Sequence, residues 1–154
     1  MELIPLPLSK RPIDITIIIF FIINLFFITY MVDLVHWYGR NFDPLVMARP
    51  AWWRATIWID SLFFGPFYAF AIYAYFKGRN WIRFGSIIWA SVMLTNVTII
   101  LFEEVNGEHA SPHLGRVFLS NAAWVVFPAI VLYRMWRSIH PFATIVNAHQ
   151  NQRV

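Results

Sequence analysis

The sequence predicts an all-α integral membrane protein, a bundle of four transmembrane helices. Of its 154 residues, 59% are hydrophobic and 19% aromatic, whereas only 13% are charged. This balance lies outside the usual range of soluble domains. The apolar residues also gather in four long blocks, which run from about Ile13 to Tyr30, Ala55 to Phe76, Phe84 to Phe102 and Val117 to Trp136.

Each block is long enough, at about 1.5 Å of rise per residue, to cross a hydrocarbon core about 30 Å thick. Backbone polar groups in lipid need partners within the protein, and the blocks lack the alternation of a barrel strand, so we expect helices. The first block is longer than the core of a signal peptide and lacks a small-x-small cleavage site. We therefore expect a cytoplasmic N-terminal segment over residues 1–12, a four-helix domain over 13–140 and a short, weakly structured cytoplasmic tail over 141–154.

Basic residues predict the orientation. With four spans, the two ends and the middle loop share one side, which carries Lys10, Arg11, Lys77, Arg79, Arg83, Arg134, Arg137 and Arg153. The other side carries Arg40, Arg49, Arg54 and Arg116. Because basic residues favour the cytoplasmic side, we expect both termini in the cytoplasm. The net charge of +4 then reflects the membrane topology. The sequence contains no DNA-reading motif that would favour nucleic-acid binding.

Two carboxylates inside the blocks are the main functional candidates. The first block continues beyond Tyr30 as MVDLVHWY, so Asp33 lies late in the first span, whereas Asp60 lies early in the second. The turn of the chain between them brings both to a similar depth. A carboxylate at membrane depth is costly unless it is protonated, hydrated or paired. We expect the two to face one cavity as a coupled pair, suited to proton transfer or to a cationic ligand. The alternative is that each reaches water or Arg54 at a helix end.

Further polar residues extend this candidate site. Thr29, Asp33 and His36 follow i, i+4, i+7 spacing and share one helical face. In the third span, Asn96 and Glu103 are seven residues apart and continue a polar stripe. Interhelical hydrogen bonding is the alternative explanation of these polar residues.

The fourth span places an amide beside an indole, because Asn121 and Trp124 are i, i+3 neighbours. An indole face stabilises a cation by about 0.5 to 2 kcal/mol. Alternatively, Trp124 is an aromatic residue that lies at the membrane interface. His109 and His113 have metal-ligand spacing, but Pro112 separates them and no third ligand is close, so we expect neither metal nor cofactor.

Four segments resemble the EXPERA-domain family, which contains the emopamil-binding sterol isomerase and the sigma-2 receptor. They read ITYMVDLVHWYGRNFDPL, WIDSLFFGPFYAFAIYAYFKGRNWIR, ILFEE and SNAAWVVFPAIVLY, in that order. The last has the spacing of Asn121, Trp124 and Pro128 found in the isomerase. The resemblance implies an intramembrane pocket for sterol-like or cationic amphiphilic molecules, a homodimer and, in a eukaryote, the endoplasmic reticulum membrane.

The resemblance also implies roles for residues. Asp33 and Asp60 fall on the family's two acids, and Asn121 with Trp124 on the pair credited with holding a carbocation. Asp43 falls on an acid that supports the pocket in the sigma-2 receptor. The chain departs from the isomerase at Thr29, where that enzyme has His, and at both acids, where it has Glu.

The expected function is an isomerase or cyclase that acts on a sterol- or terpenoid-like lipophilic substrate through a carbocation. Asp60 is the expected proton donor and Asp33 the acceptor or its electrostatic partner, while Asn121 and Trp124 stabilise the developing charge. The alternative is a non-catalytic protein that binds or traffics sterols or cationic amphiphiles. A third alternative is a purely structural membrane subunit, in which the two intramembrane carboxylates would have no function.

Overall fold

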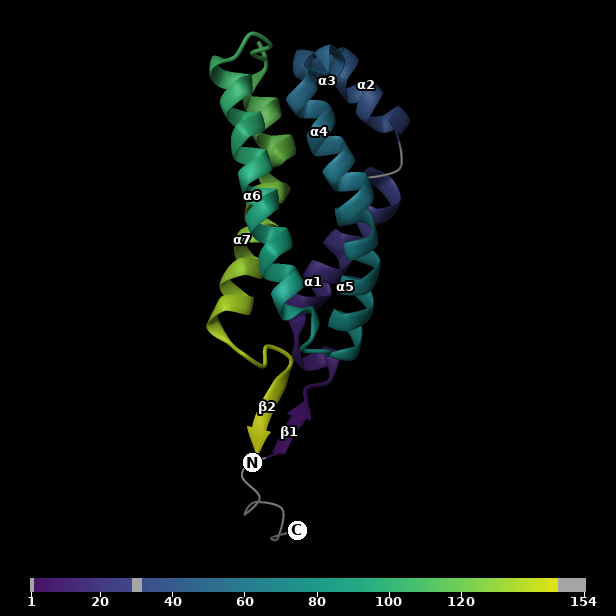
Figure 1. Ribbon diagram of the computed structural model, residues 1–154, viewed down its shortest axis with the longest axis vertical. Coiled ribbons are helices and arrows are strands. Elements are labelled where there is room, and N and C mark those ends of the chain that lie inside the picture. Colours follow the sequence, from purple (N-terminus) through teal and green to yellow (C-terminus); the bar gives the residue numbers. More distant parts are fainter. Residues whose placement is uncertain (1, 29–31, 147–154) are drawn as a thin grey trace.

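The computed structural model describes residues 2–28 and 32–146, and helices dominate it (Figure 1). In chain order the elements are β1 (Glu2–Pro5), η1 (Leu8–Lys10), α1 (Pro12–Ile23), η2 (Asn24–Ile28), α2 (Val32–Phe42), α3 (Pro44–Ala48), α4 (Ala51–Ile59), η3 (Asp60–Phe64), α5 (Gly65–Lys77), α6 (Ile82–Asn106), α7 (Leu114–Arg137) and β2 (Ala143–Val146). The η1 segment is a 3₁₀ turn, whereas η2 and η3 are single π-helical turns.

Three helices in the described residues are long and apolar enough to cross a membrane. They cover Ala51–Lys77, Ile82–Asn106 and Leu114–Arg137, and each extends beyond the span expected from the sequence. The first predicted span is an apolar helix over Pro12–Phe27, which is shorter than the other three. Residues 29–31, near the end of that predicted span, lie outside the described part of the chain.

The outward faces of these helices carry large apolar side chains. Phe84, Phe102 and Leu119 are each at least two-thirds exposed, at 69%, 70% and 78%. Exposed apolar side chains over whole helices are unfavourable in water and favourable against lipid chains. The surface therefore agrees with the helix lengths in indicating a membrane protein.

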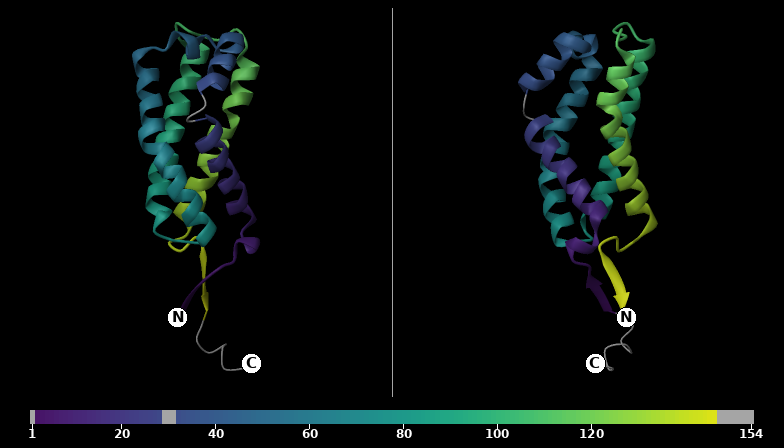
Figure 2. Two further views of the ribbon diagram at one scale, coloured as in Figure 1. Left: turned by 90° about the vertical axis from the view of Figure 1, so that its right-hand side faces the viewer. Right: turned by 180° about the vertical axis from the view of Figure 1, so that it is seen from behind.

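Aromatic side chains fill the interior near the strand end of the bundle. Phe21 packs edge-on against Trp89 and Tyr75, with ring centroids 5.1 and 5.6 Å away. Phe20 stacks on Phe127 at 4.4 Å, which joins α1 to α7. Edge-to-face and offset-stacked pairs are the favourable arrangements of aromatic rings. This packing fixes α1 against the other helices, and α6 lies beside α7 in both views of Figure 2.

The two π-helical turns have local causes. In η3 the Gly65 N–H bonds to the Asp60 carbonyl, and the next residue, Pro66, has no N–H to continue an α-helical ladder. In η2 the side chain of Asn24 donates from Nδ2 to the Phe20 carbonyl at 2.8 Å and so competes for the backbone ladder. Such wide turns often mark functional sites in helices.

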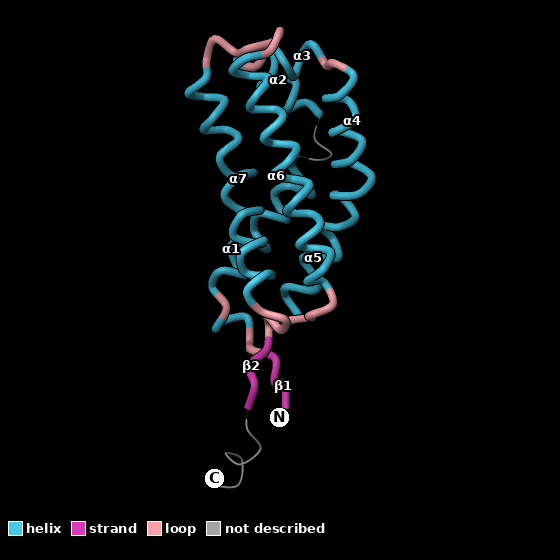
Figure 3. Tube along the Cα trace, turned by 60° about the vertical axis from the view of Figure 1, so that its left-hand side comes forward, coloured by secondary structure: helices cyan, strands magenta, loops and turns pink. Residues whose placement is uncertain are grey.

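Segments from the two ends of the chain meet at one end of the bundle. Strand β1 pairs antiparallel with β2, with Glu2 opposite Val146 and Pro5 opposite Ala143. Figure 3 shows this pair extending beyond the helices. We expected residues 141–154 to be weakly structured, and this prediction is wrong for Ala143–Val146, which form strand β2.

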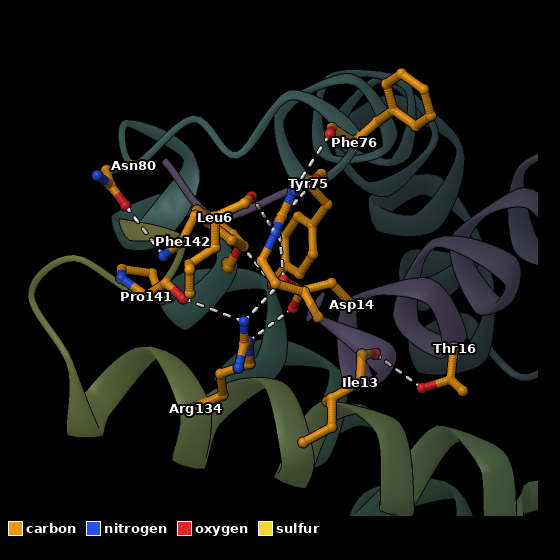
Figure 4. A network of polar contacts seen from close by, with 12 residues as sticks. Leu6, Ile13, Asp14, Thr16, Tyr75, Phe76, Asn80, Arg134, Pro141 and Phe142 are labelled. Carbon is orange, nitrogen blue, oxygen red and sulfur yellow. Dashed lines mark hydrogen bonds and ion pairs between the residues drawn. The ribbon is translucent and has the colours of Figure 1, made fainter. Parts of the chain in front are cut away.

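A buried carboxylate joins these segments to the helices (Figure 4). Asp14, which is fully buried, accepts a hydrogen bond at Oδ2 from Arg11 at 2.9 Å and pairs through both oxygens with Arg134 at 2.7 Å. Arg11 also donates to the carbonyls of Leu6, at 3.0 Å, and Tyr75, at 2.9 Å. The cluster of Arg11, Asp14 and Arg134 therefore holds α1, α5, α7 and the strand segments together.

Candidate functional site

A cavity of about 370 Å³ lies between α2, α4, η3, α6 and α7, and Asn24 of η2 also lines it. Its walls are largely apolar, with side chains such as Phe64 and Met93. Five of the residues singled out from the sequence line it together, namely His36, Asp60, Asn96, Asn121 and Trp124. These five come from four helical segments and are spread over 89 positions of the chain, so the fold, and not local sequence, assembles them.

Asp60 reaches the cavity from the first position of the π-helical turn η3. A π turn carries one extra residue, which rotates the side chains at its start relative to the rest of the helix. The next turn returns to α-helical geometry in α5, whose first residues include Phe67 and Tyr68 of the aromatic interior. Local geometry thus lets one continuous span present an acid to the cavity and rings to the core.

Trp124 is held in the cavity wall by a residue that the sequence analysis missed. Its Nε1–H donates to Oδ1 of Asn24 at 2.8 Å. Asn24 is 2% exposed and also lines the cavity. The signal in the sequence was a single amide within the apolar run IIIFFIINLFFI, where an unpartnered polar group would be costly. Asn24 and Asp60 each begin a π-helical turn, and both face the same cavity.

Asn121 and His36 occupy other parts of the wall. Asn121 donates from Nδ2 to the Val117 carbonyl at 2.9 Å, one turn earlier in α7. His36, in α2, contacts the guanidinium of Arg49 through Nε2, and Arg49 lines the cavity as well. The cavity therefore combines an acid, a guanidinium, an imidazole and amides within an apolar wall.

Two expected residues lie elsewhere. Asp43 is 4% exposed and caps α3, where its Oδ1 accepts from the Val46 N–H at 3.2 Å. Such a cap satisfies a helix N-terminal N–H, so Asp43 fixes the start of α3. Glu103 accepts a long bond of 3.4 Å from the His109 N–H and is not among the lining residues of the cavity. Its neighbour Glu104, which the sequence analysis passed over, is fully buried.

The side chains of two further predicted site residues are not described. Thr29 belongs to the undescribed stretch 29–31, and the side chain of Asp33 is likewise undescribed, although its backbone is in the first turn of α2. The pairing of Asp33 with Asp60 thus stays a prediction. Within the described ranges, no three His, Asp or Glu side chains come together as a metal site requires.

A helical membrane protein with an apolar cavity and a few inward polar groups is the class that these features define. The model of the EXPERA family, the expanded EBP superfamily, matches residues 30–135. Sigma intracellular receptor 2 of Homo sapiens and that of Macaca fascicularis are each 32% identical over 120 residues, covering 69% of this chain and 68% of theirs. The Xenopus tropicalis receptor is 32% identical over 80 residues, covering 51% and 47%. The chain belongs to the EXPERA family.

Proposed function

We propose that the protein binds a sterol- or terpenoid-like lipophilic molecule in the cavity, with Asp60 facing a cationic or polar group of that molecule. One observation carries the proposal: an acid opens into an apolar cavity of about 370 Å³ between apolar helices. This volume lies within the range of small-molecule pockets, which combine apolar walls with a few polar groups. The similarity to receptors named sigma intracellular receptor 2 supports a binding role.

The electrostatics of the cavity support a ligand with a polar end. An ammonium group of a ligand would be attracted to the carboxylate of Asp60, because opposite charges attract strongly in an apolar cavity. Arg49 and His36 lie against each other in the same wall, so they supply a second polar region for a hydroxyl or another acceptor. An amphiphile with an apolar body and a polar end therefore fits the cavity.

The second candidate function is acid–base isomerisation or cyclisation, favoured because Asp60, Asn121 and Trp124 line one cavity. Asp60 would give its proton to one carbon of an isolated double bond and leave a carbocation on the other. Loss of a proton from the adjacent carbon to Asp33 would form the shifted double bond, and proton return from Asp33 to Asp60 would complete the cycle. The ring of Trp124, fixed through Asn24, would stabilise the cation in a site from which water is excluded.

The remaining parts of the proposal concern the membrane. We propose four spans over residues 13–140, between the cytoplasmic segments 1–12 and 141–154. The pairing of β1 with β2 at one end of the bundle supports this, because an even number of crossings returns the chain to the side where it began (Figure 1). A homodimer and, in a eukaryotic cell, the endoplasmic reticulum membrane complete the proposal.

Ligand binding by purified protein tests the proposed role of Asp60. The probes are a sterol-sized tertiary amine and its uncharged isostere, measured with wild type, Asp60→Asn and Glu108→Gln. A charge-assisted contact contributes about 1.5–3 kcal/mol, so Asp60→Asn should weaken amine binding about tenfold or more and isostere binding much less. Glu108 is exposed and outside the cavity wall, so its variant should match wild type. Unchanged amine binding in Asp60→Asn would contradict the proposal.

Incubation in D₂O separates binding from catalysis. Protonation of a double bond from exchangeable acids places deuterium on carbon, so an isomerase should label a sterol with an isolated double bond. Mass spectrometry would detect this label with wild type and not with Asp60→Asn. Tight binding without carbon-bound deuterium would support the binding function and remove the isomerase candidate for that substrate.

A further inference from the structure

A second cavity, of about 380 Å³, lies at the strand end of the bundle, between the start of α1 and the end of α7. Ile13 and Ile130 form an apolar part of its wall, and Arg134, Arg137 and Tyr133 form a polar part. Figure 4 shows Ile13 and Arg134 side by side between α1 and α7. This cavity shares no lining residue with the cavity around Asp60.

The polar part of this wall has an excess of positive charge. Asp14 is shared between two guanidiniums, those of Arg11 and Arg134, so one acid compensates two bases. Arg137 donates to the hydroxyl of Tyr133 at 2.7 Å, and that phenol carries no charge. The described residues that line the cavity include no acid. The wall residues Arg134 and Arg137, with Arg11 and Asp14 behind them, therefore carry three positive charges against one negative charge.

The end of α7, beside the cavity, carries aromatic and apolar side chains of the kind found at a membrane boundary. Tyr133, Trp136 and Ile139 are 64%, 76% and 72% exposed at the end of the α7 span. Aromatic residues at the end of a transmembrane helix prefer the level of the lipid headgroups. Arg137 lies between Trp136 and Ile139 and is exposed, so we expect it at the depth of the lipid phosphate groups. The cavity thus combines a cationic rim with an apolar floor at a headgroup level.

We propose that this cavity binds the phosphate of an anionic phospholipid, whose first acyl carbons lie against Ile13 and Ile130. Arg137 and the outer face of Arg134 donate to the phosphate oxygens, because a guanidinium fork fits phosphate geometry. Arg134 keeps 21% exposure of its side chain despite its contacts with Asp14. Basic pockets between transmembrane helices bind lipid headgroups in this way. The lipid then braces α7 against α1 beside the cluster that joins the strand segments.

Native mass spectrometry of the full chain in detergent tests the proposal, with equal amounts of phosphatidylglycerol and phosphatidylcholine added. Wild type should retain phosphatidylglycerol over phosphatidylcholine by about fivefold or more. Arg137→Gln should reduce that preference about fivefold, the effect of one basic residue near an anionic lipid. Arg40→Gln, which removes an exposed charge from α2 at the other end of the bundle, should retain the wild-type preference. Ile130→Trp should fill the floor and reduce lipid retention with every charge in place.

Three results would overturn the proposal. Equal retention of the two lipids would remove the preference for an anionic lipid. An equal effect of Arg40→Gln and Arg137→Gln would reduce that preference to general attraction by net charge. Displacement of phosphatidylglycerol by millimolar inorganic phosphate would assign the site to the free anion, without the acyl contact. Because Arg137 is exposed at a helix end, its variant should fold, and the unfolding transition of each variant would verify this.

Discussion

Replacement of Asp14 by Asn should destabilise the protein strongly, because it removes the one carboxylate between two guanidiniums. The side chain of Asp14 is 0% exposed, that of Arg11 3% and that of Arg134 21%. Breaking a buried ion pair by removing one partner costs about 3–5 kcal/mol, since the other charge stays buried. Arg134 can be hydrated after the change whereas Arg11 cannot, so we expect the lower half of that range, about 3–4 kcal/mol.

Unfolding of the purified protein in mixed detergent–SDS micelles measures this change. A loss of about 3–4 kcal/mol corresponds to two to three orders of magnitude in the unfolding equilibrium constant. In the double variant Asp14→Asn/Arg134→Gln, the combined loss should be smaller than the sum of the single losses by about 0.5–3 kcal/mol, because the residues contact each other. Lys77→Gln, an exposed charge at the same end, should change stability by less than about 0.5 kcal/mol.

The reasoning fails if Asp14→Asn changes the free energy of unfolding no more than Lys77→Gln does. Strict additivity of Asp14→Asn and Arg134→Gln would also contradict it, because the two side chains would then act independently despite the contacts of 2.7 Å.

Two further predictions concern the interior and a helix end. Asn24→Leu should leave Nε1 of Trp124 without its acceptor, lower stability by about 0.6–2 kcal/mol and weaken ligand binding; wild-type values in SDS unfolding and in binding would contradict this. Gly78→Ala should destabilise by about 1 kcal/mol, because Gly78 ends α5 with φ 65°. Gly115→Ala, where an added Cβ meets nothing within 4 Å, serves as its control and should be neutral or stabilising; equal stability of the two variants would refute the assignment of strain to Gly78.

The long helices were predictable because lipid imposes one rule on every residue of a span. The blocks from Ala55 to Phe76 and from Phe84 to Phe102 contain few charges, and the helices found there extend them at both ends. Strands β1 and β2 gave no such signal, because each has four residues and its partner lies at the other end of the chain. Pairing over that separation depends on the helices between them, which bring the two segments together.

The site could be predicted in part, because a polar residue inside a membrane span is costly unless it has a partner or a function. Asp60 and Trp124 were predicted on this ground and line the cavity, whereas Asn24, the partner of Trp124 and 100 positions before it in the chain, was not predicted. Arg134 was interpreted only as a marker of topology, although it pairs with Asp14 across the bundle. Residue type and depth can be inferred from the sequence, whereas contacts between helices depend on rotation about each helix axis and on turns such as η3.

Photo-crosslinking with a sterol that carries a diazirine tests most directly whether the cavity around Asp60 is the ligand site. Adducts mapped by peptide mass spectrometry should fall on the wall segments at Thr56–Asp60 and Met93–Val97, and excess unlabelled sterol should suppress them. Adducts confined to lipid-facing side chains such as Phe84 and Leu119, without competition, would contradict the account.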